Sequence, residues 1–184
     1  MKKVVKFGGS SLASAKQFKK VAAIIGAEKS RRFIVPSAPG KRDSKDEKVT
    51  DLLYMAYDAA ATGASYKKIF EKIKSRFQGI IDGLNLNLDL GHEFAKIEEN
   101  FVSKQGRDYA ASRGEYLNGI ILANYLGCEF IDAADVIFFK DDGTFDSEHT
   151  NEELEERLKN IERVVIPGFY GVTNSGKIKT FSRG

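Results

Sequence analysis

The stretch Val4-Val5-Lys6-Phe7-Gly8-Gly9-Ser10-Ser11 decides the fold, because an apolar run ends there in two glycines and two serines. Apolar residues bounded by Gly-Gly predict a buried strand, and the glycines let the backbone approach a ligand closely because they lack a Cβ atom. Backbone N–H groups in such a turn, and at the start of the helix that we expect next, create a positive potential for an anion. We therefore interpret the stretch as a strand that enters a phosphate-binding turn, in which Lys6 holds a phosphate that is being transferred. A tight strand-to-helix turn with a solvated lysine fits this stretch alone equally well, since Gly-Gly turns are common.

Length and composition restrict the class of protein. The chain has 184 residues, of which 42% are hydrophobic and 30% charged, and this is typical of a soluble globular protein with one domain. The net charge is only +3, with 29 basic residues mixed among 26 acidic ones, so we expect no nucleic-acid partner. The sequence has no long apolar run and no leader with a cleavage site, so we expect no membrane insertion, no secretion and a cytoplasmic location.

The single cysteine and the two histidines offer little metal or nucleophilic chemistry. Cys128 lies in an apolar context and is expected to pack in the core, and an internal disulfide is not possible. His92 and His149 lie far apart in charged surroundings, so a zinc site or a Ser-His-Asp triad is poorly supported.

Two further apolar runs end in turns of small residues. Phe33-Ile34-Val35 enters Pro36-Ser37-Ala38-Pro39-Gly40, and Val164-Val165-Ile166 enters Pro167-Gly168-Phe169-Tyr170-Gly171. In open α/β sheets ligands bind at the carboxyl ends of the strands, so we expect all three turns to line one crevice and Ser37 to lie beside the first turn. Considered alone, Ser37 would be a turn-forming hydroxyl.

Helical spacing of apolar residues predicts most of the remaining chain. Capping boxes that start at Ser14 and at Thr150 predict two helix starts, and Thr50 is expected to cap another helix. Residues 63–105 carry apolar stripes but no residues that indicate chemistry, and we interpret them as helical insertions that build one wall of the site.

Residues 41–48 form a strongly charged segment. Seven of the eight are charged and none is apolar, which predicts a mobile surface loop. Such a loop is either a lid or a solvated connection, and solvated connections are commoner.

Acidic residues give two candidate positions. Glu115 follows a glycine in what we expect to be the first turn of a helix. There it either complements the helix dipole, which is worth about 0.3–1 kcal/mol, or faces the crevice and binds an ammonium group, and the spacing alone does not decide. Asp132 and Asp135 invite a paired-carboxylate interpretation, but carboxylates between strands are usually solvated or capping groups.

Taken together, these stretches resemble the catalytic domain of aspartate kinases. Six of them occur in the order, and at roughly the intervals, of that family: Lys6-Phe7-Gly8-Gly9-Ser10-Ser11, Ser37-Ala38-Pro39-Gly40, Thr50-Asp51-Leu52, Gly114-Glu115-Tyr116-Leu117, Pro167-Gly168-Phe169-Tyr170-Gly171 and Thr180-Phe181-Ser182-Arg183-Gly184. The resemblance runs from the first residue to the last. It implies an α/β fold, a three-layer sandwich in which helices flank a mainly parallel sheet, as in the N-terminal lobe of amino-acid kinases.

The resemblance implies ATP-dependent phosphorylation of the β-carboxylate of L-aspartate to aspartyl phosphate, in lysine, threonine and methionine biosynthesis. ATP would be a co-substrate, and Mg²⁺ would arrive with the nucleotide. Glu115 would bind the substrate ammonium, and Arg183 would pair with a substrate carboxylate in a bidentate manner. The full set of implied roles is a catalytic Lys6, a phosphate-binding group of Gly8, Gly9 and Ser10, and a substrate-binding group of Ser37, Thr50, Glu115 and Arg183.

Members of this family usually continue into a second half-domain, which carries the adenine and ribose site, and then into effector-binding domains. We therefore expect residues 1–184 to form the N-terminal, amino-acid-binding part of the kinase domain, with the nucleotide-binding half absent. Alone, this part is expected to turn over slowly or not at all. An unmatched apolar face where the sheet would continue is expected to favour association, including homo-oligomers.

Two other functions are compatible with the same residues. Another amino-acid kinase, of the glutamate or acetylglutamate type, would share the glycine-rich opening strand, and preference for glutamate over aspartate would identify it. A non-catalytic interaction or regulatory fragment would keep the fold, and it would be favoured if aspartate binding did not depend on Glu115 and Arg183.

Overall fold

The computed structural model describes residues 2–103 and 105–182. The strands are β1 (Lys3–Phe7), β2 (Arg31–Pro36), β3 (Glu129–Phe130), β4 (Phe138–Phe139), β5 (Val164–Val165), β6 (Tyr170–Thr173) and β7 (Ile178–Thr180). The α-helices are α1 (Ala15–Gly26), α2 (Val49–Ala61), α3 (Lys67–Gly83), α4 (Gly91–Val102), α5 (Arg107–Leu126) and α6 (Ser147–Arg157). Two short 3₁₀ helices are η1 (Gly9–Leu12) and η2 (Ala133–Asp135).

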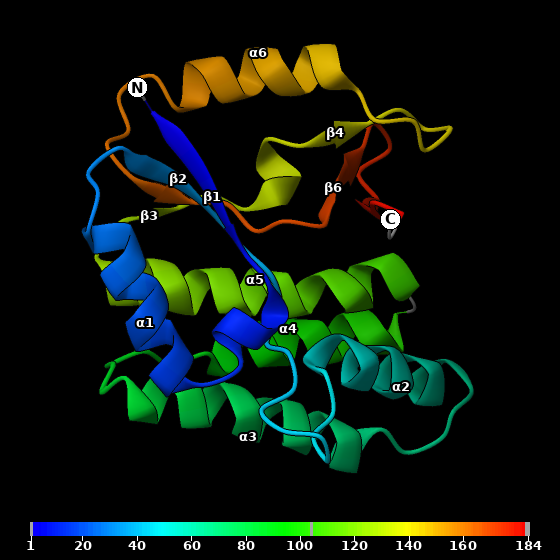
Figure 1. Ribbon diagram of the computed structural model, residues 1–184. Helices are drawn as coiled ribbons and strands as arrows, with labels where there is room; N and C mark the ends of the chain where they lie inside the picture. Colours follow the sequence, from blue (N-terminus) through cyan, green and yellow to red (C-terminus); the bar gives the residue numbers. More distant parts are fainter. Residues whose placement is uncertain (1, 104, 183–184) are drawn as a thin grey trace.

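Two sheets form the centre of the molecule (Figure 1). The first has the strand order β1-β2-β5-β3, and all of its pairings are parallel. The second has the order β4-β6-β7, in which β4 and β6 are parallel and β7 is antiparallel to β6. The predicted α/β fold with a mainly parallel sheet is therefore confirmed.

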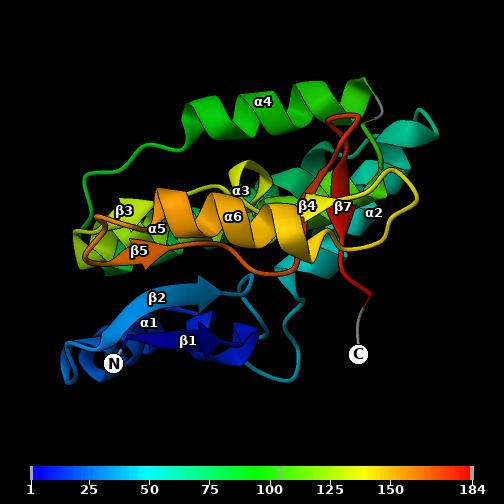
Figure 2. The same ribbon diagram turned by 90° about the horizontal axis from the view of Figure 1, so that it is seen from above.

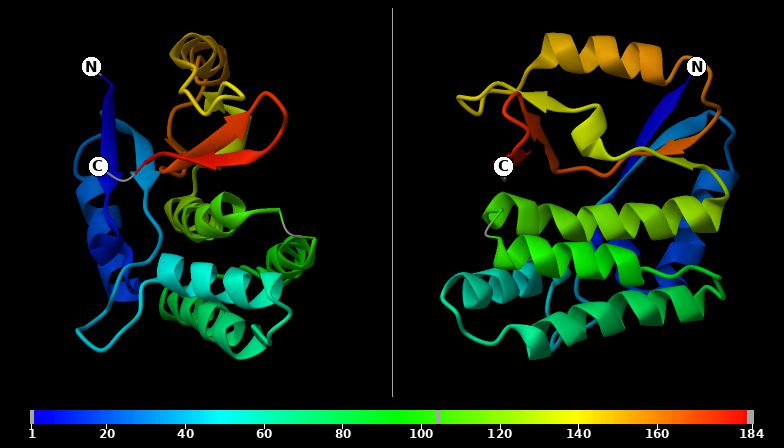
Figure 3. Two further views of the ribbon diagram at one scale, coloured as in Figure 1. Left: turned by 90° about the vertical axis from the view of Figure 1, so that its right-hand side faces the viewer. Right: turned by 180° about the vertical axis from the view of Figure 1, so that it is seen from behind.

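Helices lie on both sides of the sheets. Helix α6 covers one side and α5 the other, and α2 and α3 form a further layer beyond α5 (Figures 1 and 3). Seen from above, β1, β2 and α1 lie together at one edge of the molecule (Figure 2). The start of the chain therefore builds this edge of the molecule.

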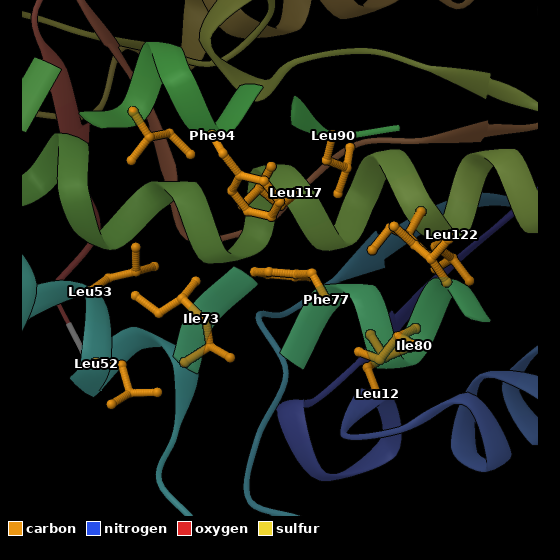
Figure 4. Close-up of a cluster of buried hydrophobic side chains, with 14 of the residues drawn as sticks. Leu12, Leu52, Leu53, Ile73, Phe77, Ile80, Leu90, Phe94, Leu117 and Leu122 are labelled. Atoms are coloured by element: carbon orange, nitrogen blue, oxygen red, sulfur yellow. The ribbon is translucent and has the colours of Figure 1, made fainter. Parts of the chain in front are cut away.

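The main core lies where α1 to α5 pack against each other and against the first sheet. Figure 4 shows part of it, with Leu12, Phe77, Leu117 and Leu122 from several different elements. Burying one such side chain contributes about 1.5–3 kcal/mol. A smaller apolar cluster, which includes Val136 and Tyr170, lies among η2, β5, β6 and α6. Residues 63–105 are helical for most of their length and supply much of the main core.

One predicted helix start on this framework is wrong, and the capping at another differs from the prediction. Helix α2 begins at Val49 with Lys48 as its N-cap, so Thr50 lies inside the first turn and is buried rather than capping. The reason is that the Val49 N–H donates to the Pro39 carbonyl at 3.2 Å, which fixes the helix start before Thr50. Ser14 is the N-cap of α1 as predicted, but it caps through its backbone carbonyl, without a side-chain capping bond in this structure.

The predicted start of α6 at Thr150 is also wrong. Helix α6 begins at Ser147, and Asp146 is the N-cap, whose carboxylate accepts the His149 N–H at 3.2 Å. The Thr150 hydroxyl is instead buried and accepts the Phe138 N–H at 2.9 Å. The threonine therefore joins α6 to β4, which is a contact that sequence spacing does not show.

One face of the first sheet carries an apolar groove of about 250 Å³. Val4, Phe33 and Val35 line it on one side, and Leu154 of α6 and its C-cap residue Leu158 line it on the other. Val4 is 67% exposed, because β1 is the last strand of the described sheet at this edge. This matches the exposed apolar face that the sequence predicts.

Replacing Phe101 by alanine is expected to lower the free energy of unfolding by about 3–5 kcal/mol, because the ring is fully buried among other aromatic rings and its loss leaves a cavity. The neighbouring Val102 is 68% exposed, so Val102→Ala is the matched control, with an expected change below about 0.5 kcal/mol. Urea denaturation followed by circular dichroism measures both variants. Equal losses would show that the helical layer is not packed as described.

Candidate active site

The first glycine turn packs directly against the turn that follows β2. Gly8 is the N-cap of η1, and the Gly40 N–H donates to the Gly9 carbonyl at 2.9 Å. A Cβ atom on Gly9 would lie 2.9 Å from the Ala38 carbonyl oxygen, and one on Gly40 would lie 2.7 Å from the Gly9 carbonyl carbon. Only glycine fits at both positions, because real Cβ contacts are longer than this.

Ser37 lies beside the first turn, as the sequence predicts. Its N–H donates to the Phe7 carbonyl at 3.0 Å, which continues the parallel pairing of β1 and β2 by one residue. From the other side, the Asn118 side-chain amide of α5 donates to the Ser37 carbonyl at 2.7 Å. The Asn118 amide oxygen is buried and has no hydrogen-bond partner among the described residues. Ser37 is thus fixed by its backbone from two directions.

The position of Glu115 differs from the prediction. Helix α5 begins at Arg107, so Glu115 lies well inside the helix and does not complement the dipole at its N-terminus. Gly114 does not mark a helix start; it lets α5 approach the turn after β2, because a Cβ atom there would lie 2.7 Å from the Ala38 Cβ. This close approach brings the buried Glu115 carboxylate to the carboxyl end of β2. Of the two roles that the sequence leaves open for Glu115, the geometry therefore favours a carboxylate that faces the crevice over one that complements the helix dipole.

Two adjoining cavities lie at this end of the sheet. The larger, of about 610 Å³, is lined by Lys6, Ser37, Glu115, Gly168, Phe169, Phe181 and Ser182. The smaller, of about 430 Å³, is lined by Gly9, Ser10, Ser37, Ala38, Pro39, Gly40, Lys41, Lys48, Thr50 and Glu115. Ser37 and Glu115 line both cavities and so form the boundary between them.

The structure thus brings most of the predicted site residues together. The larger cavity is lined by Lys6, Ser37 and Glu115. The smaller cavity is lined by Ser37 and Glu115 again, together with Gly9, Ser10 and Thr50. Gly8 precedes Gly9 at the start of η1 without lining either cavity. Arg183 lies outside the described residues, so its predicted role stays a prediction.

Several lining residues were not among the predicted site residues. Phe169 and Phe181 belong to stretches that the sequence singles out, but nothing in the sequence shows that they line the cavity. Phe169 has a φ angle of 78°, an unusual value for a residue other than glycine that costs about 1–3 kcal/mol, and its carbonyl accepts the Phe181 N–H at 2.8 Å. Lys41 and Lys48 also line the smaller cavity, and they belong to the charged segment that the sequence predicts to be a mobile surface loop.

Arg113, a buried residue of α5 two positions before Glu115, is enclosed by aromatic rings. The Arg113 guanidinium carbon lies 4.4 Å from the centre of the Tyr116 ring and 5.3 Å from that of Tyr170. The Tyr170 hydroxyl donates to Asp132 at 2.7 Å, and burial raises the pKa of Tyr170 well above its ordinary value. Asp132 also accepts the Ala134 N–H at 3.0 Å, so it is a capping and hydrogen-bonding group rather than a member of a reactive carboxylate pair.

Metal-binding clusters and membrane-spanning helices are both absent from residues 2–103 and 105–182. In those ranges, no three histidine, cysteine, aspartate or glutamate side chains are grouped so that they could hold a metal ion. No helix in the same ranges is both long enough and apolar enough to cross a membrane.

The fold places the chain among the α/β proteins whose ligand sites lie at the carboxyl ends of parallel strands. The sequence model of the Amino acid kinase family matches residues 1–184. The chain belongs to the amino acid kinase family.

Similar proteins narrow the comparison further. Aspartokinase 3 of Bacillus subtilis (strain 168) is 33% identical over an alignment of 199 residues, which covers 98% of this chain and 43% of that protein. A crystal structure of the aspartate kinase of Clostridium acetobutylicum superposes with a TM-score of 0.95 at 49% identity, covering 98% of this chain and 42% of that one. The crystal structure of E. coli aspartokinase III in complex with aspartate and ADP has a TM-score of 0.80 at 22% identity, with 98% and 43% covered, and supports the fold alone. The chain thus resembles aspartate kinases and spans less than half of the length of these relatives.

Replacing Gly9 by alanine is expected to lower the free energy of unfolding by about 1–3 kcal/mol, because the new Cβ would meet the backbone of Ala38 and Gly40. At Gly26, at the end of α1, an added Cβ would have no atom within 4 Å, so Gly26→Ala is the matched control and is expected to be neutral or slightly stabilising. Thermal and urea unfolding measure both changes. A neutral Gly9→Ala variant would contradict the described packing of the two turns.

Proposed function

We propose that the chain is the amino-acid-binding part of an aspartate kinase, which phosphorylates the β-carboxylate of L-aspartate with ATP. The observation that carries the proposal is the convergence of Lys6, Ser37 and Glu115 on one cavity beside the first glycine turn. The 49% identity to the Clostridium acetobutylicum aspartate kinase, over nearly all of this chain, supports the choice of aspartate over other substrates of the family.

The charges around the two cavities suit a small dicarboxylate that also carries an ammonium group. Under the proposal, the Glu115 carboxylate binds the substrate ammonium, and the hydroxyls of Ser37 and Thr50 contact the amino acid. Arg183 is proposed to pair with a substrate carboxylate, for which a planar guanidinium is better suited than an ammonium. Because the substrate already presents a carboxylate nucleophile, the reaction needs no general base.

The phosphoryl end of the proposed site is the first glycine turn. Lys6 and the backbone N–H groups of Gly8, Gly9 and Ser10 would stabilise the negative charge of the phosphoryl group, and this stabilisation supplies most of the catalysis in phosphoryl transfer. Mg²⁺, when bound with ATP, would neutralise phosphate charge, and we propose that it arrives with the nucleotide.

The rest of the assignment follows from the same proposal. We propose that residues 1–184 form the N-terminal, amino-acid-binding part of the kinase domain, and that the nucleotide-binding half is not part of these residues. The apolar groove beside Val4 is an unpaired face of the kind that favours association, including homo-oligomers. We further propose a cytoplasmic location and a role in lysine, threonine and methionine biosynthesis.

Binding of L-aspartate to the purified chain tests the substrate pocket directly. Isothermal titration calorimetry is expected to detect L-aspartate binding, and Glu115→Gln is expected to weaken it by about tenfold or more, because it removes a charge-assisted interaction with the ammonium. Glu129, exposed at the amino end of β3, provides the matched control Glu129→Gln, which is expected to bind as tightly as the wild type. Tighter binding of L-glutamate than of L-aspartate would instead favour the glutamate type of kinase. Unchanged L-aspartate binding in the Glu115→Gln variant would favour a non-catalytic fragment.

Lys6 is the residue to change for the chemical step. With the nucleotide-binding half present, Lys6→Met is expected to lower kcat for aspartyl phosphate formation by about 10²–10³-fold, because it removes a positive charge proposed to stabilise the transferring phosphoryl group. L-Aspartate affinity measured by calorimetry is expected to change far less, which separates this loss from misfolding. A kcat within about threefold of the wild type would rule out the proposed role of Lys6.

A further inference from the structure

Arg76 of α3 is a buried cation outside the candidate site. Its side chain is 5% exposed. Its guanidinium group contacts segment 40–48, which is Gly40 together with the charged residues 41–48, at three points. One nitrogen donates to the Gly40 carbonyl at 2.9 Å; the other donates to the Asp46 carboxylate and, at 3.3 Å, to the Glu47 carbonyl. A planar guanidinium presents several N–H donors in a fixed geometry, so it can bridge these three acceptors at once.

These contacts hold in place a segment that the sequence predicts to be a mobile surface loop, either a lid or a solvated connection. Arg42 adds three hydrogen bonds to the same Asp46 carboxylate, two from its side chain and one from its backbone. The hydrogen bonds from Arg42 and the charge of Arg76 hold the pKa of Asp46 well below its ordinary value, so this carboxylate stays ionised throughout the neutral range. The Asp46 carboxylate is thus the acceptor that both arginines share, even though the residues before it in the segment are exposed.

The segment forms a wall between two cavities. On one side lies a cavity of about 510 Å³, lined by Arg76, Lys72 and Glu71 of α3 together with Asp46 and Glu47. On the other side lies the smaller site cavity, which Lys41 and Lys48 from the two ends of the segment help to line. Figure 1 shows the segment, in cyan, as it passes beside α3 on its way to α2. Arg76 therefore reaches the site only through this wall.

The link from Arg76 to the glycine turn is short. Arg76 holds the Gly40 carbonyl, and the N–H of the same Gly40 donates to Gly9. At the other end, Glu47 precedes Lys48, which is the N-cap of the helix that carries Thr50. The Arg76 side chain thus holds segment 40–48 near both of its ends. One end is packed on Gly9, and the other leads into the helix that carries Thr50.

We propose that Arg76 is a positioning residue for the aspartate cavity: it fixes segment 40–48 so that Lys41 and Lys48 face the cavity and the Gly40 turn stays packed on Gly9. The substrate in this proposal rests on the proposed function. A solvated connection of this length needs no buried charge, and burying a guanidinium carries a desolvation cost. The three contacts made by Arg76 all lie on this one segment, which gives the buried charge a function beyond filling the core.

Limited trypsin digestion tests the fixing of the segment without any assumption about the substrate. Residues Lys41, Arg42, Lys45 and Lys48 are cleavage sites within it. Arg76→Met is expected to raise the rate of cleavage at these sites by about tenfold relative to cleavage elsewhere in the chain, because local opening exposes the backbone. Lys72→Met is the matched control: Lys72 lies one turn earlier on α3 and binds Glu47 of the same segment at 2.9 Å, but it is 61% exposed, so little change is expected.

Under the proposed function, kinetics measured with the nucleotide-binding half present test the effect on the site. Arg76→Met is expected to raise KM for L-aspartate by about tenfold and to lower kcat by a smaller factor, since the segment lines the binding cavity directly and reaches the phosphoryl turn only through the hydrogen bond from Gly40 to Gly9. Arg76→Lys is expected to recover part of the affinity, because an ammonium still pairs with Asp46 but does not bridge the two carbonyls. Lys72→Met is expected to leave both constants unchanged.

The outcomes separate this proposal from the proposed function. Failure of the wild-type chain to bind L-aspartate, or of a kinase that also has the nucleotide-binding half to phosphorylate it, would overturn the proposed function. The digestion result does not depend on the substrate and would still test the fixing of the segment. An unchanged KM in Arg76→Met, or cleavage in segment 41–48 no faster than in the wild type, would overturn the positioning role. Should Arg76→Met not fold, Asp46→Asn removes the partner carboxylate while the arginine remains, and it is expected to give the same increase in cleavage and in KM.

Discussion

The close packing of Gly9 against Gly40 is the constraint on which the rest of the site depends. The backbones of two turns, more than a strand and a helix apart in sequence, meet through a 2.9 Å hydrogen bond in a space that excludes any Cβ atom. Parallel pairing of β1 with β2 delivers both turns to the same edge of the sheet. Because the turns share one wall, a ligand held by the first turn lies next to the residues of the second. The cavity is thus a consequence of backbone geometry before any side chain contributes to it.

Helix α5 completes the cavity by approaching the same turns from the other side. Gly114 allows contact with Ala38, and one turn further along the helix Asn118 holds the Ser37 carbonyl. The two residues lie on one face of α5, and Glu115, between them, reaches the boundary of the two cavities. A larger residue at position 114 would push the helix away, and the carboxylate with it. The placement of the acidic group therefore depends on a packing contact and not on the helix dipole.

The strands and their turns are predictable from local sequence signals. The helix starts, the position of Glu115 and the order of segment 40–48 depend on long-range contacts, which the sequence does not show. Apolar runs that end in Gly-Gly or Pro-Gly identify β1, β2, β5 and their turns, because strand propensity and turn chemistry act over a few residues. The sequence places Glu115 in a first turn because a glycine is typical of a helix boundary, whereas Gly114 serves the contact between α5 and Ala38. Thr50 likewise resembles a cap in the sequence, but the Pro39 carbonyl sets the start of α2. The sequence does not show the order of segment 40–48, because its partner Arg76 lies 36 residues from Gly40 and belongs to no motif.

The charges that face the two cavities explain why a predominantly anionic ligand with one cationic group is the best match. Lys6 lies at the larger cavity and Lys41 and Lys48 at the smaller one, while Glu115 is the acidic residue that both share. The three lysines are exposed, so solvent screens each of them and each alone attracts an anion only weakly. Glu115 is buried, so its attraction for a cation is screened far less. Under the proposed function, the buried carboxylate therefore selects the ammonium group, and the lysines, held by the glycine turn and by segment 40–48, attract the carboxylates and the phosphate.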